Sequence, residues 1–377
     1  MGLPGGVTGP PRQLIAKTPL FRNEWLDYAT FGWLNISTPE VLGAEKILER
    51  LVKLKRLGLG ALLVCMLVAP HAQASAQSGS FDDWLAQFRQ EAAAEGISAA
   101  TLDRALGGLE PIPRVIERDR RQPEGRLTFR DYNQRVLSSS RIERGRELMR
   151  EHRGLLERVA ADYGVQPRFI VALWGIESTY GTFTGEYPVI GALATLAYEG
   201  RRAAFFRKEL LQALRIVDQG DVEPAQMMGS WAGAMGQSQF MPSSYLAHAV
   251  DYDGDGRRDI WTSPPDVFAS IANYLAKAGW NQRHTWGRQV RLSNHLDAEA
   301  AGLEVVKPLP EWHALGVKRS NGDDLPLVAL NASLLRMDDG EGPAYLVYNN
   351  FRVLMAWNRS TYFALTVGEL ADLIDHG

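Results

Sequence analysis

The segment at residues 167–180, PRFIVALWGIESTY, sets a single carboxylate among some of the most apolar residues of the chain. Read at the period of an α-helix, Glu177 shares one stripe with three large apolar side chains, those of Ile170, Leu173 and Trp174. A stripe of this kind is usually buried in a folded protein. We therefore expect a helix here that holds Glu177 in a dry environment.

The ends of this helix are also marked in the sequence. Pro167 suits the first helical turn, Gly175 allows another element to approach closely, and Gly181 can end the helix. Glu177 then lies near the helix C-terminus, where burial and the negative end of the helix dipole both disfavour its ionised form. We expect a raised pKa for Glu177, as a general acid near neutral pH needs. The alternative is a structural carboxylate paired with an arginine.

Length and charge exclude some classes of protein. The chain has 377 residues, of which 45% are hydrophobic and 23% charged, an ordinary composition for one large globular domain or two to three smaller ones. Its formal net charge is -3. Domains that bind nucleic acid are usually basic, so we expect no nucleic-acid partner.

The first 74 residues read as separate from the folded protein. Lysine and arginine precede an apolar run at 57–69, and the small residues Ala72 and Ala74 follow at the spacing of a cleavage site, so residues 51–74 are typical of a cleavable signal peptide. The run is too short for a permanent membrane span. Because a signal normally opens a chain, we interpret residues 1–50 as a non-native or untranslated extension. We expect a mature protein of residues 75–377 in the periplasm.

The chain has one cysteine, Cys65, which lies inside the apolar run and follows Val64. A lipoprotein signal has a small residue at that preceding position, so we predict a form without a lipid anchor. Cys65 should leave with the signal peptide. The mature protein then has no thiol, which excludes disulfides, thiolate metal sites and cysteine nucleophiles.

Further segments indicate ligand recognition. The segment 229–245, GSWAGAMGQSQFMPSSY, combines amide and hydroxyl side chains, which bond sugar hydroxyl and acetamido groups, with aromatic rings that cover an apolar sugar face. Tyr132 lies in a short aromatic patch and is a further candidate contact. The pair Arg201 and Arg202 at a helix start opposes the helix dipole, which favours an acidic ligand there. A surface pair without a role is the alternative.

The segment 251–262, DYDGDGRRDIWT, reproduces the start of a calcium-binding loop. Side-chain carboxylates at positions 1, 3, 5 and 9 and a backbone carbonyl at position 7 give the candidate ligands Asp251, Asp253, Asp255, Asp259 and Arg257. Position 12, where a bidentate glutamate belongs, is Thr262, and Asp266 is a substitute from outside the loop. The alternative is a metal-free turn built from Asp and Gly.

The rest of the chain predicts a mainly α fold with a small β subdomain. Helical periodicity continues to residue 278, whereas the segment near 298–348 contains the short apolar runs LPLVALNASLLRM and AYLVY around the turn DDGEG, which are typical of strands. The final segment returns to helix. We expect Trp357 and Asn358 in a loop between a strand and the last helix.

These motifs together resemble the lytic murein transglycosylases of the B type over the whole mature chain. The resemblance rests on DRRQPE at 119–124, GIESTYG, ALATLAYEGRRAAFF, GSWAGAMGQSQFMPSSY, DYDGDG followed by ANYLAKAGW, and AWNRS, in that order. It implies a lysozyme-like core, similar to the goose type, with a helical subdomain, a small β subdomain and an EF-hand-like calcium loop. It also implies cleavage of peptidoglycan between N-acetylmuramic acid and N-acetylglucosamine to leave 1,6-anhydromuramoyl ends.

The resemblance implies a role for each matching residue. Glu177 corresponds to the acid and base. The polar groups of the cleft are Ser230, Gln239, Tyr274 and Asn358, its walls are Tyr132, Phe205, Phe240 and Trp357, and the contacts to acidic groups are Arg201 and Arg202. Family members can carry tyrosine where this chain has Phe205 and Trp357, so a hydroxyl is lost at each. The implied calcium is structural, no organic cofactor is expected, and the expected partners are glycan strands and other cell-wall enzymes.

Two other functions stay open. A lysozyme-type hydrolase would cut the same bond with water, and a binding protein would hold the glycan without cutting it. Most glycosidases use two carboxylates, but Glu186 and Glu199 lie in or beside glycine-containing loops, where we expect them to be solvated. Glu177 would then act first as acid and afterwards as base.

Overall fold

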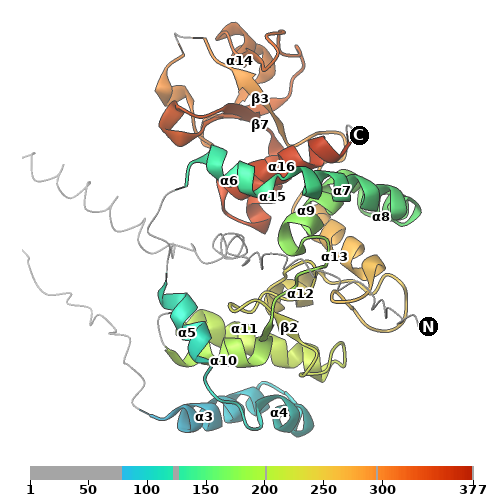
Figure 1. Cartoon of the computed structure of the whole chain (residues 1–377), viewed down its shortest axis with the longest axis vertical. Coiled ribbons are helices and arrows are strands. Elements are labelled where there is room, and N and C mark those ends of the chain that lie inside the picture. Colours follow the sequence, from blue (N-terminus) through green and yellow to red (C-terminus); the bar gives the residue numbers. More distant parts are fainter. Residues whose placement is uncertain (1–78, 122–126, 200–201, 294–295, 376–377) are drawn as a thin grey trace, which may run out of the picture.

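The structure is a computed structural model that describes residues 79–121, 127–199, 202–293 and 296–375. The predicted extension at 1–50, the predicted signal peptide at 51–74 and Arg201 lie outside these residues. The described part is mostly helical, with a small antiparallel sheet at one end of its long axis (Figure 1). None of the helices in this part is both long and apolar enough to cross a membrane.

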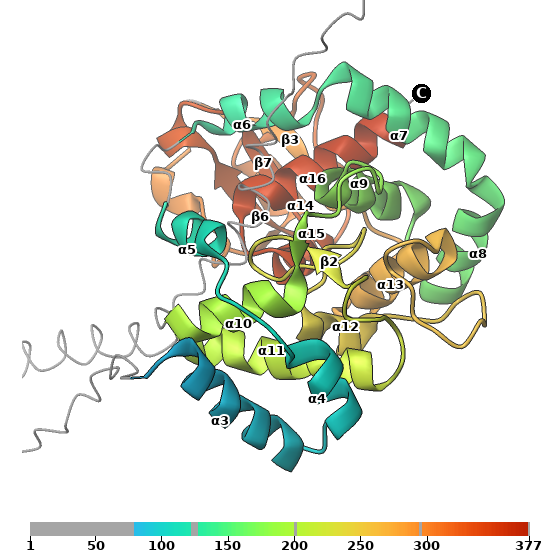
Figure 2. The ribbon, with the colours of Figure 1, turned by 60° about the horizontal axis from the view of Figure 1, so that its bottom comes forward.

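One end of the molecule is a group of helices, with α10 packed along α11, α5 on α10, and α3 and α4 beside that pair (Figure 2). The bounds are Phe81–Ala94 for α3, Ala99–Leu106 for α4, Pro113–Arg120 for α5, Val189–Glu199 for α10 and Ala203–Asp218 for α11. Trp84 and Phe88 form the buried stripe of α3, as the sequence periodicity predicts. This group is the helical subdomain that we expected.

The middle of the molecule is built around α9, Pro167–Ser178, which packs against α7, α8, α13 and α16. Every residue from 169 to 178 is buried, which explains why the sequence here is apolar on all sides. The other helices of this region are α6 Phe129–Val136, α7 Ser139–Glu151, α8 Arg153–Tyr163, α12 Pro242–His248, α13 Pro264–Lys277, α15 Asn349–Trp357 and α16 Thr361–Asp375. The predicted helix around Glu177 is thus the central element of the fold.

The helix α9 ends three residues before the glycine that we expected to terminate it. Its last residue is Ser178, and Thr179, Tyr180 and Gly181 all have left-handed backbones, with φ of 51, 58 and 78°. This turn folds the chain back so that the Tyr180 ring lies against Gly175. The predicted close approach at Gly175 is therefore confirmed, and its partner is the residue five positions later.

The other end of the molecule is an antiparallel sheet of order β4-β6-β7-β3-β5. Its strands are β3 Gly287–Arg291, β4 Lys307–Pro308, β5 Lys318–Arg319, β6 Asn331–Arg336 and β7 Ala344–Val347, and the short helix α14 spans Leu309–Ala314. The sheet begins before the range 298–348 because β3 pairs with β7. Trp312, Leu334 and Leu346 belong to a second hydrophobic core, separate from that of the helices, so this region is a β subdomain.

The predicted strand LPLVALNASLLRM is shorter than expected. Only Asn331–Arg336 is a strand, and Leu327 and Val328 before it are 71% and 52% exposed. Their apolar side chains do not have a sheet face to cover, so propensity alone did not make a strand there. A two-stranded ladder of β1, Tyr187–Pro188, and β2, Met228–Gly229, joins the loop after α9 to the loop before α12.

Candidate active site

Glu177 lies in the last turn of α9 with only 2% of its surface exposed. Its Oε1 accepts a hydrogen bond of 2.6 Å from the indole Nε1 of Trp357. Burial raises the pKa of Glu177 to about 8, and the indole hydrogen bond opposes this rise because it favours the carboxylate. In the part of the chain that is described, the partner of Glu177 is thus an indole and not the arginine of our alternative interpretation.

Aromatic rings from two other segments pack against the indole of Trp357. The ring centroids of Tyr274 and Phe240 lie 4.7 and 5.2 Å from that of Trp357. The hydroxyl of Tyr274 donates to the carbonyl of Ala356 over 2.7 Å, so α13 holds the end of α15. We expected Trp357 in a loop, but it is the last residue of a helix. The reason is that residues 349–357 bury one face against α16 and α13.

Tyr132 and Asn358 also lie in this region. Tyr132 is buried on α6 beside the Tyr362 ring, at 5.8 Å between centroids, and burial and the charge of Glu177 both raise its pKa. Asn358 caps α15, and its Oδ1 accepts the Ser360 N–H at 3.0 Å. Asn358 thus lies between α15 and α16, whereas we had expected a strand in the place of α15.

The loop from 229 to 240 uses Ser230 and Gln239 to hold its own shape. The Ser230 hydroxyl accepts the backbone N–H of Ala234 at 3.0 Å, and the Gln239 amide donates to the carbonyls of Thr184 and Gly236 at 2.9 and 2.8 Å. Both side chains are at most 9% exposed. Their contact with a sugar stays a prediction, while Phe240 of the same loop reaches the Trp357 ring.

Gln237 joins the loop to α9, and the sequence did not single it out. Its Oε1 accepts the Trp174 indole N–H at 2.7 Å, and its amide donates to the carbonyl of Trp261 at 2.7 Å. A side chain at Gly181 would lie 2.3 Å from the Gln237 Oε1. Two features of the sequence could have indicated this contact: the two glutamines of GQSQF and the glycine that follows STY.

The remaining predicted contacts, Arg202 and Phe205, lie at the start of α11. The guanidinium of Arg202 lies 4.7 Å from the centre of the Phe205 ring at the start of α11. This contact joins the two side chains to each other, and the Phe205 ring also packs on that of Phe206. Their role toward a ligand therefore stays a prediction.

The two other candidate carboxylates are paired with arginines. Glu186 is 60% exposed in its side chain and lies 3.6 Å from Arg114. Glu199 is less solvated than we expected, at 26%, and binds Arg120 at 2.8 Å. No carboxylate is among the groups that shift the pKa of Glu177. Of the three candidate carboxylates, only Glu177 is buried.

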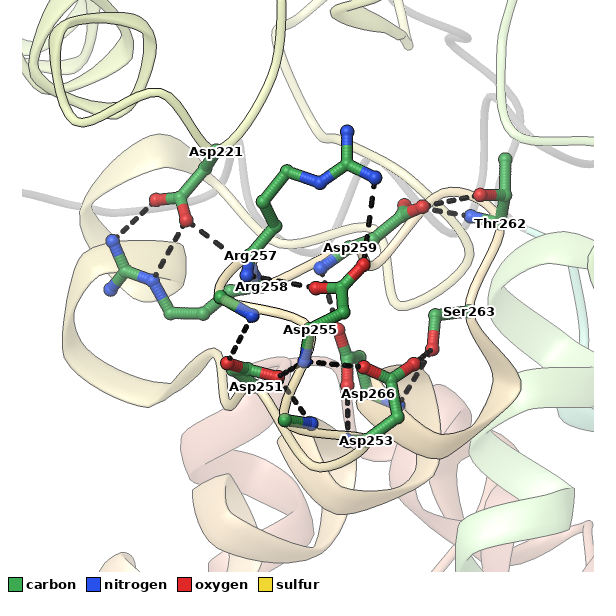
Figure 3. A network of polar contacts seen from close by, with 12 residues as sticks. Asp221, Asp251, Asp253, Asp255, Arg257, Arg258, Asp259, Thr262, Ser263 and Asp266 are labelled. Atoms are coloured by element: carbon green, nitrogen blue, oxygen red, sulfur yellow. Dashed lines mark hydrogen bonds and ion pairs between the residues drawn. The ribbon is translucent and has the colours of Figure 1, made fainter.

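The predicted calcium loop brings three aspartates together (Figure 3). The carboxylate oxygens of Asp251, Asp253 and Asp255 lie within 4.8 Å of one another. The backbone N–H groups of Gly254 and Gly256 donate to Asp251 at 2.8 and 2.9 Å, and the φ of 77 and 91° at these glycines lets the loop wrap round it. Clustered carboxylates repel one another, and hard oxygen ligands suit Ca²⁺, so these residues fit that cation.

Asp259 is not brought to this cluster. Its carboxylate accepts the Thr262 hydroxyl and the Thr262 N–H instead, because it closes the turn that starts the next helix (Figure 3). Asp266 is buried beneath the loop and accepts the N–H groups of Tyr252 and Asp259, both at 2.7 Å. It thus supports the loop from outside. The backbone role of Arg257 stays a prediction; its guanidinium pairs with Asp255.

The comparison with known families decides the identity. The sequence profile of the transglycosylase SLT domain matches residues 80–372. The chain is a member of the lytic murein transglycosylase B family. One relative, the membrane-bound lytic murein transglycosylase B of Escherichia coli (strain K12), is 33% identical over 248 residues, which are 64% of this chain and 66% of the relative. The chain therefore spans about two thirds of that relative's length.

Solved structures of lytic transglycosylases share the fold. SltB3 from Pseudomonas aeruginosa, in complex with NAG-NAM-pentapeptide, is 47% identical, with a TM-score of 0.77 over 79% of this chain and 80% of that one. Slt35 from Escherichia coli, in complex with calcium, is 29% identical, with a TM-score of 0.68 over 82% and 99%. The predictions of a mainly α, lysozyme-like transglycosylase fold and of an enzyme of the lytic transglycosylase class are confirmed.

Proposed function

We propose that this lytic transglycosylase cleaves glycan strands between N-acetylmuramic acid and N-acetylglucosamine with Glu177 as its only acid and base. The environment of Glu177 carries the proposal. It is buried, has a pKa of about 8, and belongs to α9, the helix packed at the centre of the fold. A carboxyl group with such a pKa holds its proton at neutral pH and can give it to a leaving oxygen.

The pairing of the two other candidate carboxylates with arginines favours transfer within the sugar. Retaining and inverting glycosidases place two carboxylates on either side of the bond. Here Glu186 and Glu199 are each engaged by an arginine, so Glu177 has to perform both proton transfers. As acid it protonates the glycosidic oxygen while the N-acetyl group of the muramic acid stabilises the oxocarbenium-like centre. The resulting carboxylate then takes the proton of the C6 hydroxyl, which attacks within the same ring.

The product identifies the reaction. Intramolecular attack leaves a 1,6-anhydromuramoyl end, lighter by one water than the product of hydrolysis. Mass spectrometry of peptidoglycan digested by the purified protein, with Glu177→Gln as the matched control, measures this difference. Anhydro ends made by the wild type alone support the proposal. Reducing muramic ends would assign the chain to hydrolysis, and intact glycan bound by the protein would assign it to the binding-protein class.

We also propose that the loop of Asp251, Asp253 and Asp255 binds Ca²⁺ as a structural ion. The clustered carboxylates support this, and a relative is known in complex with calcium. The loop supplies oxygen ligands and the ion would offset their mutual repulsion. The contacts of Asp266 to the backbone of the same loop connect it to α13, so binding there would stabilise the fold.

The place of action is inferred from the sequence. The signal peptide at 51–74 predicts export to the periplasm, and the substrate class is consistent with that location. Sequencing the N-terminus of the exported protein tests it: a mature chain starting near Ser75 is expected, and one that keeps Trp25 would contradict both the signal and the extension at 1–50. Other cell-wall enzymes stay a predicted class of partner.

A further inference from the structure

Packing on the ring and a hydrogen bond to the preceding backbone both hold the Trp357 indole in its position against Glu177. Trp357 is 1% exposed, and the rings of Tyr274 and Phe240 pack on it. The backbone just before it is held by the Tyr274 hydroxyl at the Ala356 carbonyl. The indole Nε1 therefore has little freedom to leave the Glu177 Oε1, 2.6 Å away.

The indole N–H can only donate a hydrogen bond. The Oε1 that it contacts must then offer a lone pair in both protonation states of Glu177. When the carboxyl group is protonated, its proton is left to Oε2. A tyrosine hydroxyl can donate and accept, so it would impose no such choice.

We propose that Trp357 is a positioning residue that keeps the acidic proton of Glu177 on Oε2 and holds the carboxyl plane in place for both proton transfers. The inference rests on the proposed function of Glu177. In the first transfer, the proton leaves Oε2 for the glycosidic oxygen. In the second, the carboxylate formed takes the hydroxyl proton back on Oε2, while Oε1 stays bonded to the indole. The carboxyl group thus returns to its starting state with no rotation.

The same hydrogen bond stabilises the carboxylate between the two transfers. It lowers the pKa of Glu177 against the rise that burial causes. Removal of the donor should therefore raise that pKa. A hydrogen bond to a charged group has a strength that corresponds to a shift of about one to two pKa units.

The test replaces the indole by benzothiophene, with benzothienylalanine at position 357. Sulfur then takes the place of the N–H while ring size and packing are kept. The matched control is the same replacement of Trp84 on α3, which is 4% exposed and whose indole Nε1 has no hydrogen-bond partner in the described structure. The pKa of Glu177 is measured by carboxyl carbon NMR, assigned with Glu177→Gln, and kcat/KM is measured against pH.

We expect the replacement at position 357 to raise the Glu177 pKa by about one to two units and to move the alkaline limb of kcat/KM to higher pH by the same amount. The rate at neutral pH, where the acid is already protonated, should fall by about 10- to 100-fold because the proton and the carboxyl plane are no longer fixed. The Trp84 control should show none of these changes.

Two results would overturn the inference. If the pKa of Glu177 and the alkaline limb of kcat/KM both stay unchanged, Trp357 does not position the proton and acts only through the packing of its ring, even if the rate falls. Equal effects at positions 84 and 357 would assign them to packing. Failure of the proposed function looks different: the wild-type protein would then leave the glycan uncut, whatever the NMR titration shows.

Discussion

Tyr180 lies so close to Gly175 that a methyl group on Gly175 would be 2.5 Å from the Cε1 of the ring. The Tyr180 hydroxyl also donates to the carbonyl of Arg141 over 2.8 Å, which connects α9 to α7. The ring is thus clamped between two helices directly after the acid. The packing of this ring, together with that of the four neighbouring helices, holds the C-terminal turn of α9 that contains Glu177.

Gly175→Ala should destabilise the protein by about 1–3 kcal/mol, because the new methyl group overlaps the ring and neither helix can move away freely. Thermal or denaturant unfolding measures the loss. The control is Gly154→Ala on α8, where the nearest atom is 3.8 Å away on the Arg158 side chain. It should be neutral or stabilising by up to about 1 kcal/mol. Equal effects at both sites would contradict the clamp.

Glu177→Gln should lower turnover by about 100- to 10,000-fold and leave glycan binding nearly unchanged, because the amide keeps the shape but has no proton to transfer. Turnover and binding are measured separately on purified glycan strands. Glu199→Gln serves as the control for the second carboxylate and should keep turnover. Wall lysis by the Glu177 variant at a near-normal rate would remove Glu177 from the mechanism.

Glu177→Gln should also stabilise the protein, and more so as the pH rises. The pKa of Glu177 is about 8 in the folded state and 4.5 as the ordinary value, so the folded state binds more protons between these pH values. The wild type therefore loses stability as pH rises from 4.5 to 8, by a few kcal/mol at about 1.4 kcal/mol per unit, while the variant does not. Melting temperatures from pH 4 to 9 measure this.

The control for this titration is Glu186→Gln, which changes an exposed carboxylate. Because this side chain is 60% exposed, its exchange should change the melting temperature little. A difference between Glu177→Gln and the wild type that does not grow with pH would mean that the acid is ionised without cost in the folded protein.

Added Ca²⁺ should raise the melting temperature, since a ligand that binds only the folded state stabilises it by about 2.7 kcal/mol at a concentration of about 100 times Kd. Asp255→Ala should abolish the rise, because Asp255 belongs to the cluster. Asp259→Asn should retain it, because Asp259 bonds Thr262 and an amide oxygen can still accept there. A melting temperature that stays the same with added Ca²⁺ and with a chelator would contradict the calcium site.

Local sequence was enough to predict the features that depend on one segment. The apolar stripe of residues 167–178 predicted the buried helix and the raised pKa of Glu177, because burial follows from periodicity. Gly175 predicted a close approach, and the spacing of Asp251, Asp253 and Asp255 predicted their cluster. Each of these predictions depends on residues within one short segment and on no contact with a distant part of the chain.

Contacts between distant segments were not readable in this way. The sequence left open whether Glu177 meets an arginine, and only the packing of α15 against α13 and α16 brought Trp357, 180 positions away, to its Oε1. Competition for partners was equally hidden: Asp259 bonds Thr262 and is not part of the aspartate cluster, and Glu199 pairs with Arg120. The sequence alone determined that one acid would be buried, because periodicity is local. The tertiary structure decided which of its two oxygens carries a hydrogen bond, because the direction of a hydrogen bond depends on how separate helices pack.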